Sequence, residues 1–452
     1  MSSSIVKRLT EIVGEENAIT DPLTLMAYSF DASENGEAPS IVVRPGSTEE
    51  VAKVMQAANA SGTPVIPRGG GTSLAGAALP LKGSIVLDMT RMNRVIEVSR
   101  ENLTALVEAG LKLKSLNDSL GEGLFFPIDI GSPEAATIGG MIATNASGIH
   151  SPMYGSTGDR VLGLEVVLPS GEVVQVGSRT YKTVSGLDLK RIFIGSEGTL
   201  GVITKAFIKL AKKPSRYVLL VGFFESDSDA ARAASKIIAS GLRFSAMEFM
   251  DKDTVEVASA NGPAKSPDTG AALFVEFIGE TEEGDAAREA ENAMVECRAK
   301  RVIVASGEKA DNLWKVRTSV YEAISRIYPP FMQLDPSIPV SRIPEFLSAL
   351  RRISRMHRIN ILVYGHIGEG VLHPTIIADK RDQKEIMRAR AAVREILKEA
   401  LKLGGSLTGE HGIGALKSKY VKMEFTPYEL EFMKKLKQIL DPKGILNPGK
   451  LV

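Results

Sequence analysis

The apolar residues of this chain come in short runs, and this pattern restricts the fold more than any other feature. From Ile41 to about Leu210 the runs, such as IVVRPGS and SIVLDM, are separated by glycine, and Glu49–Ala60 has the spacing of an intervening helix. Runs of this length bounded by turn residues are typical of strands. The strongest run, Tyr217–Phe224, is far shorter than the roughly 20 residues that a membrane-spanning helix needs. We therefore expect an α+β protein without a transmembrane segment.

The pattern changes after Pro214, where strand-like and helix-like segments alternate. YVLLVGFF, RFSAMEFM, AALFVEFIG and RVIVAS have the composition of strands, and SDSDAARAASKIIASG and EEGDAAREAENAMVECRAK that of helices. Such alternation predicts a second domain, an α/β cap domain with a sheet covered on one side by helices, and we expect this sheet to be antiparallel. Further helices are predicted at Lys384–Leu403, Pro427–Leu440 and Asn312–Ile327.

Charge and cysteine content exclude several classes of function. The 55 basic and 54 acidic residues give a net charge of +1, which does not favour a nucleic-acid surface. Cys297 is the only cysteine, so the chain has no intrachain disulfide and no four-cysteine zinc or iron–sulfur site. Any redox chemistry needs another carrier. Because no basic segment followed by an apolar stretch opens the chain, we expect a cytoplasmic protein, with peripheral membrane contact left open.

The segment Pro67–Gly76 (PRGGGTSLAG) directly follows a strand-like stretch. Consecutive glycines let a backbone approach a ligand closely, and their N–H groups with the neighbouring hydroxyls can surround a pyrophosphate. The segment is neither a G-x-G-x-x-G fingerprint nor a P-loop, so nucleoside triphosphate use is not indicated. Taken alone, a surface turn explains it equally well.

Two more segments rich in small residues follow, Gly131–Gly148 (GSPEAATIGGMIATNASG) and Gly195–Thr204 (GSEGTLGVIT). In this order and spacing the three segments resemble the FAD-binding domain of the family that contains vanillyl-alcohol oxidase and p-cresol methylhydroxylase. The resemblance implies a PCMH-type domain of two α+β subdomains. Members with covalent flavin usually carry a histidine in or near the first segment, and none is present here, so the resemblance implies non-covalent FAD. It also implies the following FAD-binding residues: Pro67, Arg68, Gly69, Gly70, Gly71, Thr72 and Ser73 at the pyrophosphate, Pro133, Thr137, Gly140, Asn145, Ser147 and Gly148 along the flavin and ribityl path, and Gly198, Val202 and Ile203 on the adenine side.

Three of the five histidines lie in two glycine-framed motifs, Tyr364–Pro374 (YGHIGEGVLHP) and Thr408–Gly414 (TGEHGIG). The glycines argue against a helix, whereas a strand, a turn and a second strand would bring His366 and His373 to one side of a hairpin. Two histidines and a carboxylate suit a catalytic zinc ion, with iron or manganese as alternatives. Glu410 is the preferred third ligand, because Glu369 falls in the turn and is expected to face solvent.

The neighbouring His411 is then available as a general base, because a metal that acidifies a bound hydroxyl needs an acceptor for the proton. Flanking glycines allow the tight turn that would direct the side chains of Glu410 and His411 to different targets. A single histidine more often has a structural role, but three in such motifs favour a site.

These motifs resemble the C-terminal domain of the FAD-linked oxidases, which include the glycolate oxidase FAD subunit, D-lactate dehydrogenase and D-2-hydroxyglutarate dehydrogenase. The resemblance implies a metal held by His366, His373 and Glu410, His411 as catalytic base, Arg317 as the group that binds the substrate carboxylate, and Asn447 near FAD. A guanidinium suits a carboxylate, although a single arginine is ordinarily on a solvated helix face. The expected domains are residues 1–213 (FAD-binding), 214–415 (substrate or cap domain) and 416–452 (a helical segment returning to the FAD domain).

Two positions depart from the pattern of the 2-hydroxyglutarate enzymes. Gln333 and Thr375 stand where those enzymes carry a lysine and an asparagine, which favours a monocarboxylate such as D-lactate or glycolate. The hypothesis is that His411 removes the hydroxyl proton with assistance from the metal and that the Cα hydride passes to flavin N5. A quinone, an electron-transfer flavoprotein or an iron–sulfur subunit would reoxidise the flavin. Three alternatives remain: D-2-hydroxyglutarate oxidation, a transferase like alkylglycerone-phosphate synthase, and a non-catalytic subunit. A homodimer is left open.

Overall fold

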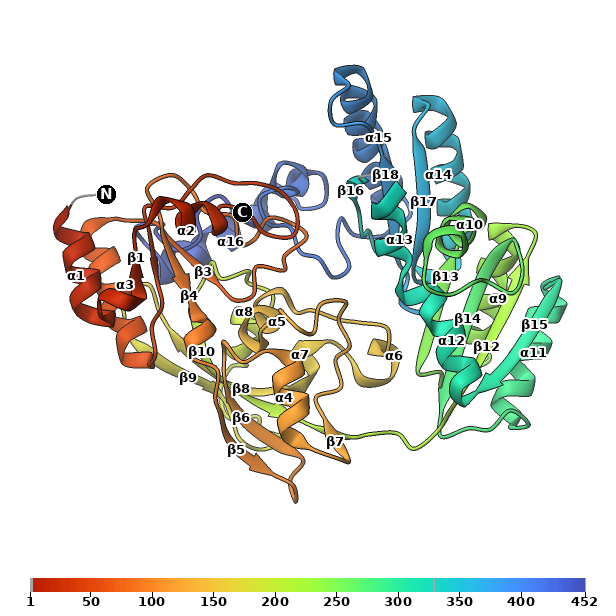
Figure 1. The fold of residues 1–452 in the computed structure, drawn as a ribbon, viewed down its shortest axis with the longest axis horizontal. Helices are drawn as coiled ribbons and strands as arrows, with labels where there is room; N and C mark the ends of the chain where they lie inside the picture. Colours follow the sequence, from red (N-terminus) through yellow and green to blue (C-terminus); the bar gives the residue numbers. More distant parts are fainter. Residues whose placement is uncertain (1–2, 328–329, 452) are drawn as a thin grey trace. The chain divides into compact units, whose positions relative to one another are not determined.

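The computed structural model describes residues 3–327 and 330–451 and divides the chain into two compact units (Figure 1). The first unit consists of Met1–Gly148, Gly155–Lys213 and Glu410–Val452, and the second of Ile149–Tyr154 and Pro214–Gly409. The chain therefore crosses from one unit to the other more than once, and each unit combines segments that are distant in sequence.

One sheet of the first unit has four strands in the order β1 (Ala18–Ile19), β2 (Ile41–Val43), β4 (Ile85–Asp88) and β3 (Val65–Arg68). The last three run parallel to one another. Helices α1 (Ser3–Val13) and α3 (Thr48–Ser61) bury apolar residues in the same core. β3 ends at Arg68, so the glycine-rich segment leaves the carboxyl end of a parallel strand.

The second sheet of this unit is antiparallel, in the order β5 (Val95–Ser99), β6 (Thr104–Glu108), β10 (Val202–Lys209), β8 (Val161–Val167) and β9 (Val173–Gly177). Helices α4 (Leu113–Leu120) and α5 (Ile138–Thr144) pack into its core. The two α+β subdomains predicted from the sequence are confirmed. The unit's remaining strands and α-helices are α2 (Pro22–Ala27), β7 (Leu124–Phe125), α7 (Thr157–Arg160), α8 (Lys190–Phe193), β11 (Ala211–Lys212) and α16 (Pro427–Leu440).

The C-terminal segment lies beside β3. After α16, Asp441 accepts hydrogen bonds from the backbone N–H groups of Ile445 and Leu446, at 3.1 and 2.8 Å. The N–H of Val65 donates to the carbonyl of Ile445, and the N–H of Asn447 donates to the carbonyl of Val65, both at 2.8 Å. These bonds bring Asn447 to the strand that leads into the glycine-rich segment.

The second unit is built on a seven-stranded antiparallel sheet. Its order is β15 (Arg301–Ser306), β12 (Tyr217–Phe224), β14 (Ala271–Ile278), β13 (Ala246–Met250), β17 (Asn360–His366), β18 (Val371–Ile377) and β16 (Pro330–Gln333). The helices are α6 (Ser151–Tyr154), α9 (Asp227–Ala239), α10 (Lys252–Asn261), α11 (Asp285–Glu296), α12 (Gly307–Thr318), α13 (Val320–Ile327), α14 (Ile343–His357) and α15 (Gln383–Lys402).

Helices cover both faces of this sheet, so the expectation of one covered side is wrong. A Cβ added at Gly222 of β12 would meet the sulfur of Met294 on α11, at 2.8 Å. The neighbouring Val221 points to the opposite face and packs in a cluster with Val316 of α12 and Ile324 of α13. A strand buried on both faces is apolar throughout, which explains the unbroken YVLLVGFF run.

The predicted helix Asn312–Ile327 is in fact two helices, α12 and α13, which meet at Ser319. There the hydroxyl and the backbone N–H of Ser319 both donate to the Lys315 carbonyl, at 2.7 and 3.2 Å. Among the helices that the structure describes, none combines the length and the apolar character required to cross a bilayer.

Candidate functional site

The two histidines of the first motif lie on a hairpin, as predicted. His366 ends β17, His373 lies in β18, and Ile367–Glu369 forms the turn between the strands. Gly370, with φ of +82°, supplies a backbone conformation that other residues rarely adopt. The two imidazole rings lie 5.2 Å apart between centroids and nearly perpendicular. Glu369 is exposed in the turn, as expected, and accepts a hydrogen bond from the Ser151 hydroxyl.

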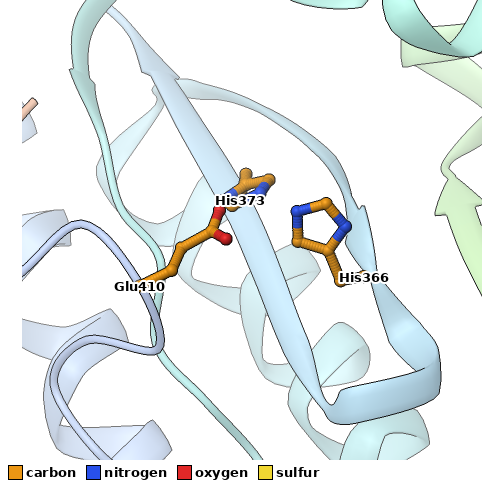
Figure 2. A group of neighbouring side chains, drawn as sticks. All are labelled: His366, His373 and Glu410. Atoms are coloured by element: carbon orange, nitrogen blue, oxygen red, sulfur yellow. The ribbon is translucent and has the colours of Figure 1, made fainter. Parts of the chain in front are cut away.

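Glu410 is peptide-bonded to Gly409, the last residue of the second unit, whose N–H donates to the carbonyl of Asp335 at 2.7 Å. His366, His373 and Glu410, called here the three-ligand group, each offer an atom that could bind a metal, and these atoms all lie within 4.8 Å of one another. Figure 2 shows one ring nitrogen of His366 facing the other two side chains.

The three-ligand group fits a divalent metal. Two imidazole nitrogens and one carboxylate oxygen are the protein ligands of open catalytic zinc sites, at about 2.0–2.2 Å from the ion. Ligand atoms already within 4.8 Å of one another could reach such distances through small rotations of the side chains.

A buried carboxylate, Glu248 of β13, supports this hairpin. Its side chain is 0% exposed, and its Oε1 lies 2.6 Å from Nδ1 of His366. The other carboxylate oxygen accepts a hydrogen bond from Arg317. Burial alone would raise the pKa of Glu248, but the charge of Arg317 and the bond to His366 outweigh burial and hold that pKa below its usual value. Because Arg317 can only donate, the geometry is that of a carboxylate that also accepts a hydrogen bond from Nδ1 of His366.

Arg317 does not lie on a solvated helix face, the ordinary alternative considered for it. It is 5% exposed on α12, and its guanidinium carbon lies 5.1 Å from the centroid of the Tyr364 ring. Within residues 3–327 and 330–451 its Nε has no hydrogen-bond partner. A buried guanidinium with an unpaired N–H is suited to an anionic ligand.

The second histidine motif forms a tight turn. Gly412 and Gly414 have φ of +82° and +50°, which bears out the glycine-based expectation of a turn. The side chain of His411 is 11% exposed, with its Nε2 3.5 Å from Oε1 of Glu410. The Ser147 hydroxyl donates to Oε2 of Glu410 at 2.9 Å. Three of the residues predicted for the site, Ser147, Glu410 and His411, are thus neighbours within the first unit.

Glu197 fixes this turn to the first unit. Its buried carboxylate accepts hydrogen bonds from the N–H groups of Ile413 and Gly414, at 2.7 and 2.6 Å. Burial outweighs these bonds and raises the pKa of Glu197. The Thr408–Gly414 motif is consequently held by a residue of the GSEGTLGVIT segment, more than 200 positions earlier in the chain.

The three segments rich in small residues meet in the first unit. A Cβ added at Gly69 would lie 2.2 Å from Oγ1 of Thr137, and one added at Gly70 would lie 2.0 Å from the carbonyl oxygen of Ala135. Gly198 of the third segment lies against Pro67. Backbones can approach this closely only where side chains are missing, which explains the consecutive glycines.

Two buried polar atoms beside these segments fit FAD. Nδ2 of Asn447 donates to the carbonyls of Ala77 and Glu197, at 3.0 and 2.7 Å. Its Oδ1, and Nη1 of Arg68, are buried without a hydrogen-bond partner in the described part of the chain. Since buried polar atoms are normally satisfied, these two suit a polar ligand, and a guanidinium suits a pyrophosphate.

Several other residues predicted to bind FAD support loops by their side chains. The Ser73 hydroxyl accepts from the N–H groups of Ala75 and Ala77. Thr137 caps α5 by accepting from the N–H of Gly140, and Asn145 ends that helix with φ of +51°. The remaining predicted residues lie in the three segments: Gly71 and Thr72 in the first loop, Pro133 and Gly148 flanking α5, and Val202 and Ile203 buried at the start of β10.

Glu248, Glu276 and Glu197 were not predicted from the sequence. The first two interrupt apolar strands, in AMEFM and LFVEFI, and both are almost fully buried. A carboxylate within such a run is a usable signal, because it must be paired to be buried. Glu276 contacts His150, which had no role in the predicted site.

Family models match both halves of the chain. Residues 213–451 match the model described as "FAD linked oxidases, C-terminal domain", and residues 39–177 match "FAD binding domain". The glycolate oxidase subunit GlcD of Bacillus subtilis is 35% identical over 100% of this chain and 97% of its own length. D-lactate dehydrogenase of Archaeoglobus fulgidus is 37% identical over 94% and 95%. Proteins named D-2-hydroxyglutarate dehydrogenase match at 32% and 33% identity.

The fold has solved counterparts. The structure of p-cresol methylhydroxylase with substrate bound aligns with a TM-score of 0.81 over 99% of this chain and 96% of that one, at 20% identity. This likeness confirms the PCMH-type architecture. With a C-terminal model over more than half its length and full-length relatives above 30% identity, the chain belongs to the family of FAD-linked oxidases.

Proposed function

We propose that this protein is a dehydrogenase that oxidises a small D-2-hydroxy acid to the 2-oxo acid, with D-lactate or glycolate as the favoured substrate. The observation that carries the proposal is the three-ligand group. His411, the proposed base, directly follows Glu410 in the sequence, and the chain has an FAD-binding domain. Relatives named for glycolate and D-lactate support the substrate class.

The proposed cofactors are non-covalent FAD and a divalent metal, zinc being preferred over iron or manganese. When bound, FAD accepts a hydride and the metal lowers the pKa of a bound hydroxyl. Arg68 and Asn447, with the Gly69–Ser73 loop, would hold FAD. His366, His373 and Glu410 would hold the metal.

Two residues of the chain would act on the substrate. Arg317 would bind the carboxylate, using N–H groups that Glu248 does not occupy, and this would fix the orientation of the Cα–H bond. His411 would accept the hydroxyl proton at an imidazole nitrogen, as a general base. Because Cys297 is the only cysteine, an outside acceptor must then remove the electrons: a quinone, an electron-transfer flavoprotein or an iron–sulfur subunit.

Two neutral side chains support a monocarboxylate. Gln333 of β16 and Thr375 of β18 are cross-strand partners, and Thr375 shares a face of β18 with His373, two residues away. Oε1 of Gln333 is buried and has no partner within the described residues. Neither side chain carries the positive charge that a second substrate carboxylate would need.

A substrate panel tests the proposal. Purified protein is mixed anaerobically with D-lactate, glycolate, L-lactate or D-2-hydroxyglutarate, and flavin absorbance near about 450 nm is followed. We expect D-lactate or glycolate to bleach the flavin, and D-2-hydroxyglutarate to do so more slowly. A stable flavin that no hydroxy acid bleaches would contradict the proposal and favour a transferase, while protein without flavin would favour a non-catalytic subunit.

A further inference from the structure

We infer that Glu248 is a positioning residue with two effects at once: it fixes which ring nitrogen of His366 can bind a metal, and it fixes the orientation of Arg317. The inference rests on the proposed metal site, and all of its contacts lie within the second unit. Glu248 is not itself one of the three ligands.

The contacts of Glu248 leave His366 one coordinating atom. Glu248 lies 2.6 Å from Nδ1 of His366, and a carboxylate can only accept a hydrogen bond there. The proton is therefore on Nδ1, and the lone pair of His366 is on Nε2. In Figure 2 one ring nitrogen of His366 faces His373 and Glu410 and the other points away. A carboxylate behind a ligating histidine fixes its tautomer and ring orientation and raises its basicity.

The second oxygen of Glu248 extends this control to Arg317. The side chains of Arg317 and Glu248 are 7% and 0% exposed, so little solvent competes for this pair. Because Arg317 and His366 share one carboxylate, its loss would disturb the proposed metal ligand and the proposed substrate ligand together. Such a shared anchor gives the two groups a fixed spacing.

The same sheet contains a matched control. Glu276 of β14 is 3% exposed and lies diagonally across from Glu248 on the same face of the sheet. It likewise contacts a histidine, His150 at 2.8 Å, and a residue of α12, Trp314 at 2.9 Å. His150 is not in the three-ligand group, so only the Glu248 arrangement should influence metal binding.

The test is Glu248→Gln, compared with Glu276→Gln and Glu248→Asp. In the first variant the amide can donate to Nδ1 of His366, which would move the proton to Nε2 and block coordination. Zinc affinity is measured by competition with a chromophoric chelator in the absence of hydroxy acid. We expect Glu248→Gln to bind zinc about 10- to 100-fold more weakly than the unaltered protein. Glu248→Asp keeps the charge but places the carboxylate one methylene farther from Nδ1 of His366, so it should lose a measurable but smaller part of the affinity, and Glu276→Gln should match the unaltered protein.

Equal zinc affinity in Glu248→Gln and the unaltered protein would overturn the inference, as would an equal loss in Glu276→Gln. If Glu248→Gln does not fold, Glu248→Asp decides by the same titration: an unchanged zinc affinity overturns the inference. Since no substrate is present, these outcomes are independent of whether a hydroxy acid bleaches the flavin. A chain that loses zinc affinity as expected but oxidises no hydroxy acid would contradict the proposed function alone.

Discussion

Replacing His411 with alanine should slow the bleaching of flavin by D-lactate by about 10²- to 10⁴-fold, the usual contribution of a positioned general base. The imidazole lies beside Glu410 in a tight turn and is largely shielded from water. Without this imidazole, the hydroxyl proton has no positioned acceptor. Hydride transfer is then slow, because the carbonyl can form only as that proton leaves. The rate is measured by anaerobic stopped-flow mixing.

The turn itself should survive this substitution, because Glu197 holds it through the backbone of Ile413 and Gly414. Flavin content and zinc affinity should therefore stay unchanged. His357→Ala is the matched control, since His357 pairs with Glu395 at the end of α14 and has no proposed role. Undiminished bleaching in His411→Ala would remove this residue from the mechanism.

Replacing Arg317 with methionine should destabilise the protein by about 3–5 kcal/mol, because it leaves a buried carboxylate without its cation. Glu248 is fully buried, and its other hydrogen-bond partner, His366, is charged only when its ring is protonated. The same variant should also lose D-lactate bleaching, because the proposed carboxylate ligand is gone. Unfolding in urea measures the first effect and anaerobic mixing the second.

A double variant separates the two roles of Arg317. Adding Glu248→Gln to Arg317→Met removes the lone charge and should recover part of the stability, whereas bleaching should remain absent. Arg352→Met is the control for stability, because Arg352 pairs with Glu399 on the surface, where such pairs contribute about 0–1 kcal/mol. A loss in Arg317→Met no greater than in Arg352→Met would show that Glu248 does not depend on this cation.

Local periodicity predicted most elements of the second unit. The long apolar runs predicted β12, β14 and β15. The helix predicted at Lys384–Leu403 differs from α15 by one residue at each end. Periodicity alone did not reveal that both faces of the sheet are covered, because a short unbroken apolar run fits either a strand buried on both faces or a segment of a buried helix. The break at Ser319 was also hidden, since one serine in a helical pattern does not by itself predict the end of a helix.

The glycine-framed histidines were predictable because glycine excludes a helix and a hairpin brings His366 and His373 to one face. Their supporting residues were not, because the pairings join distant positions. Glu248 precedes its partner His366 by 118 positions, and Glu197 precedes Ile413 by 216. Only the fold brings these groups together, and in sequence each carboxylate is a single charge among 54.

The most direct test of the central claim is removal and return of the metal. Protein is treated with a chelator until metal analysis finds almost no metal bound to the chain. Flavin bleaching by D-lactate is then measured before and after zinc is added back. We expect bleaching to fall when the metal is removed, to return when zinc is added back, and not to return in His373→Ala. An unchanged bleaching rate in metal-free protein that retains its flavin would contradict the account.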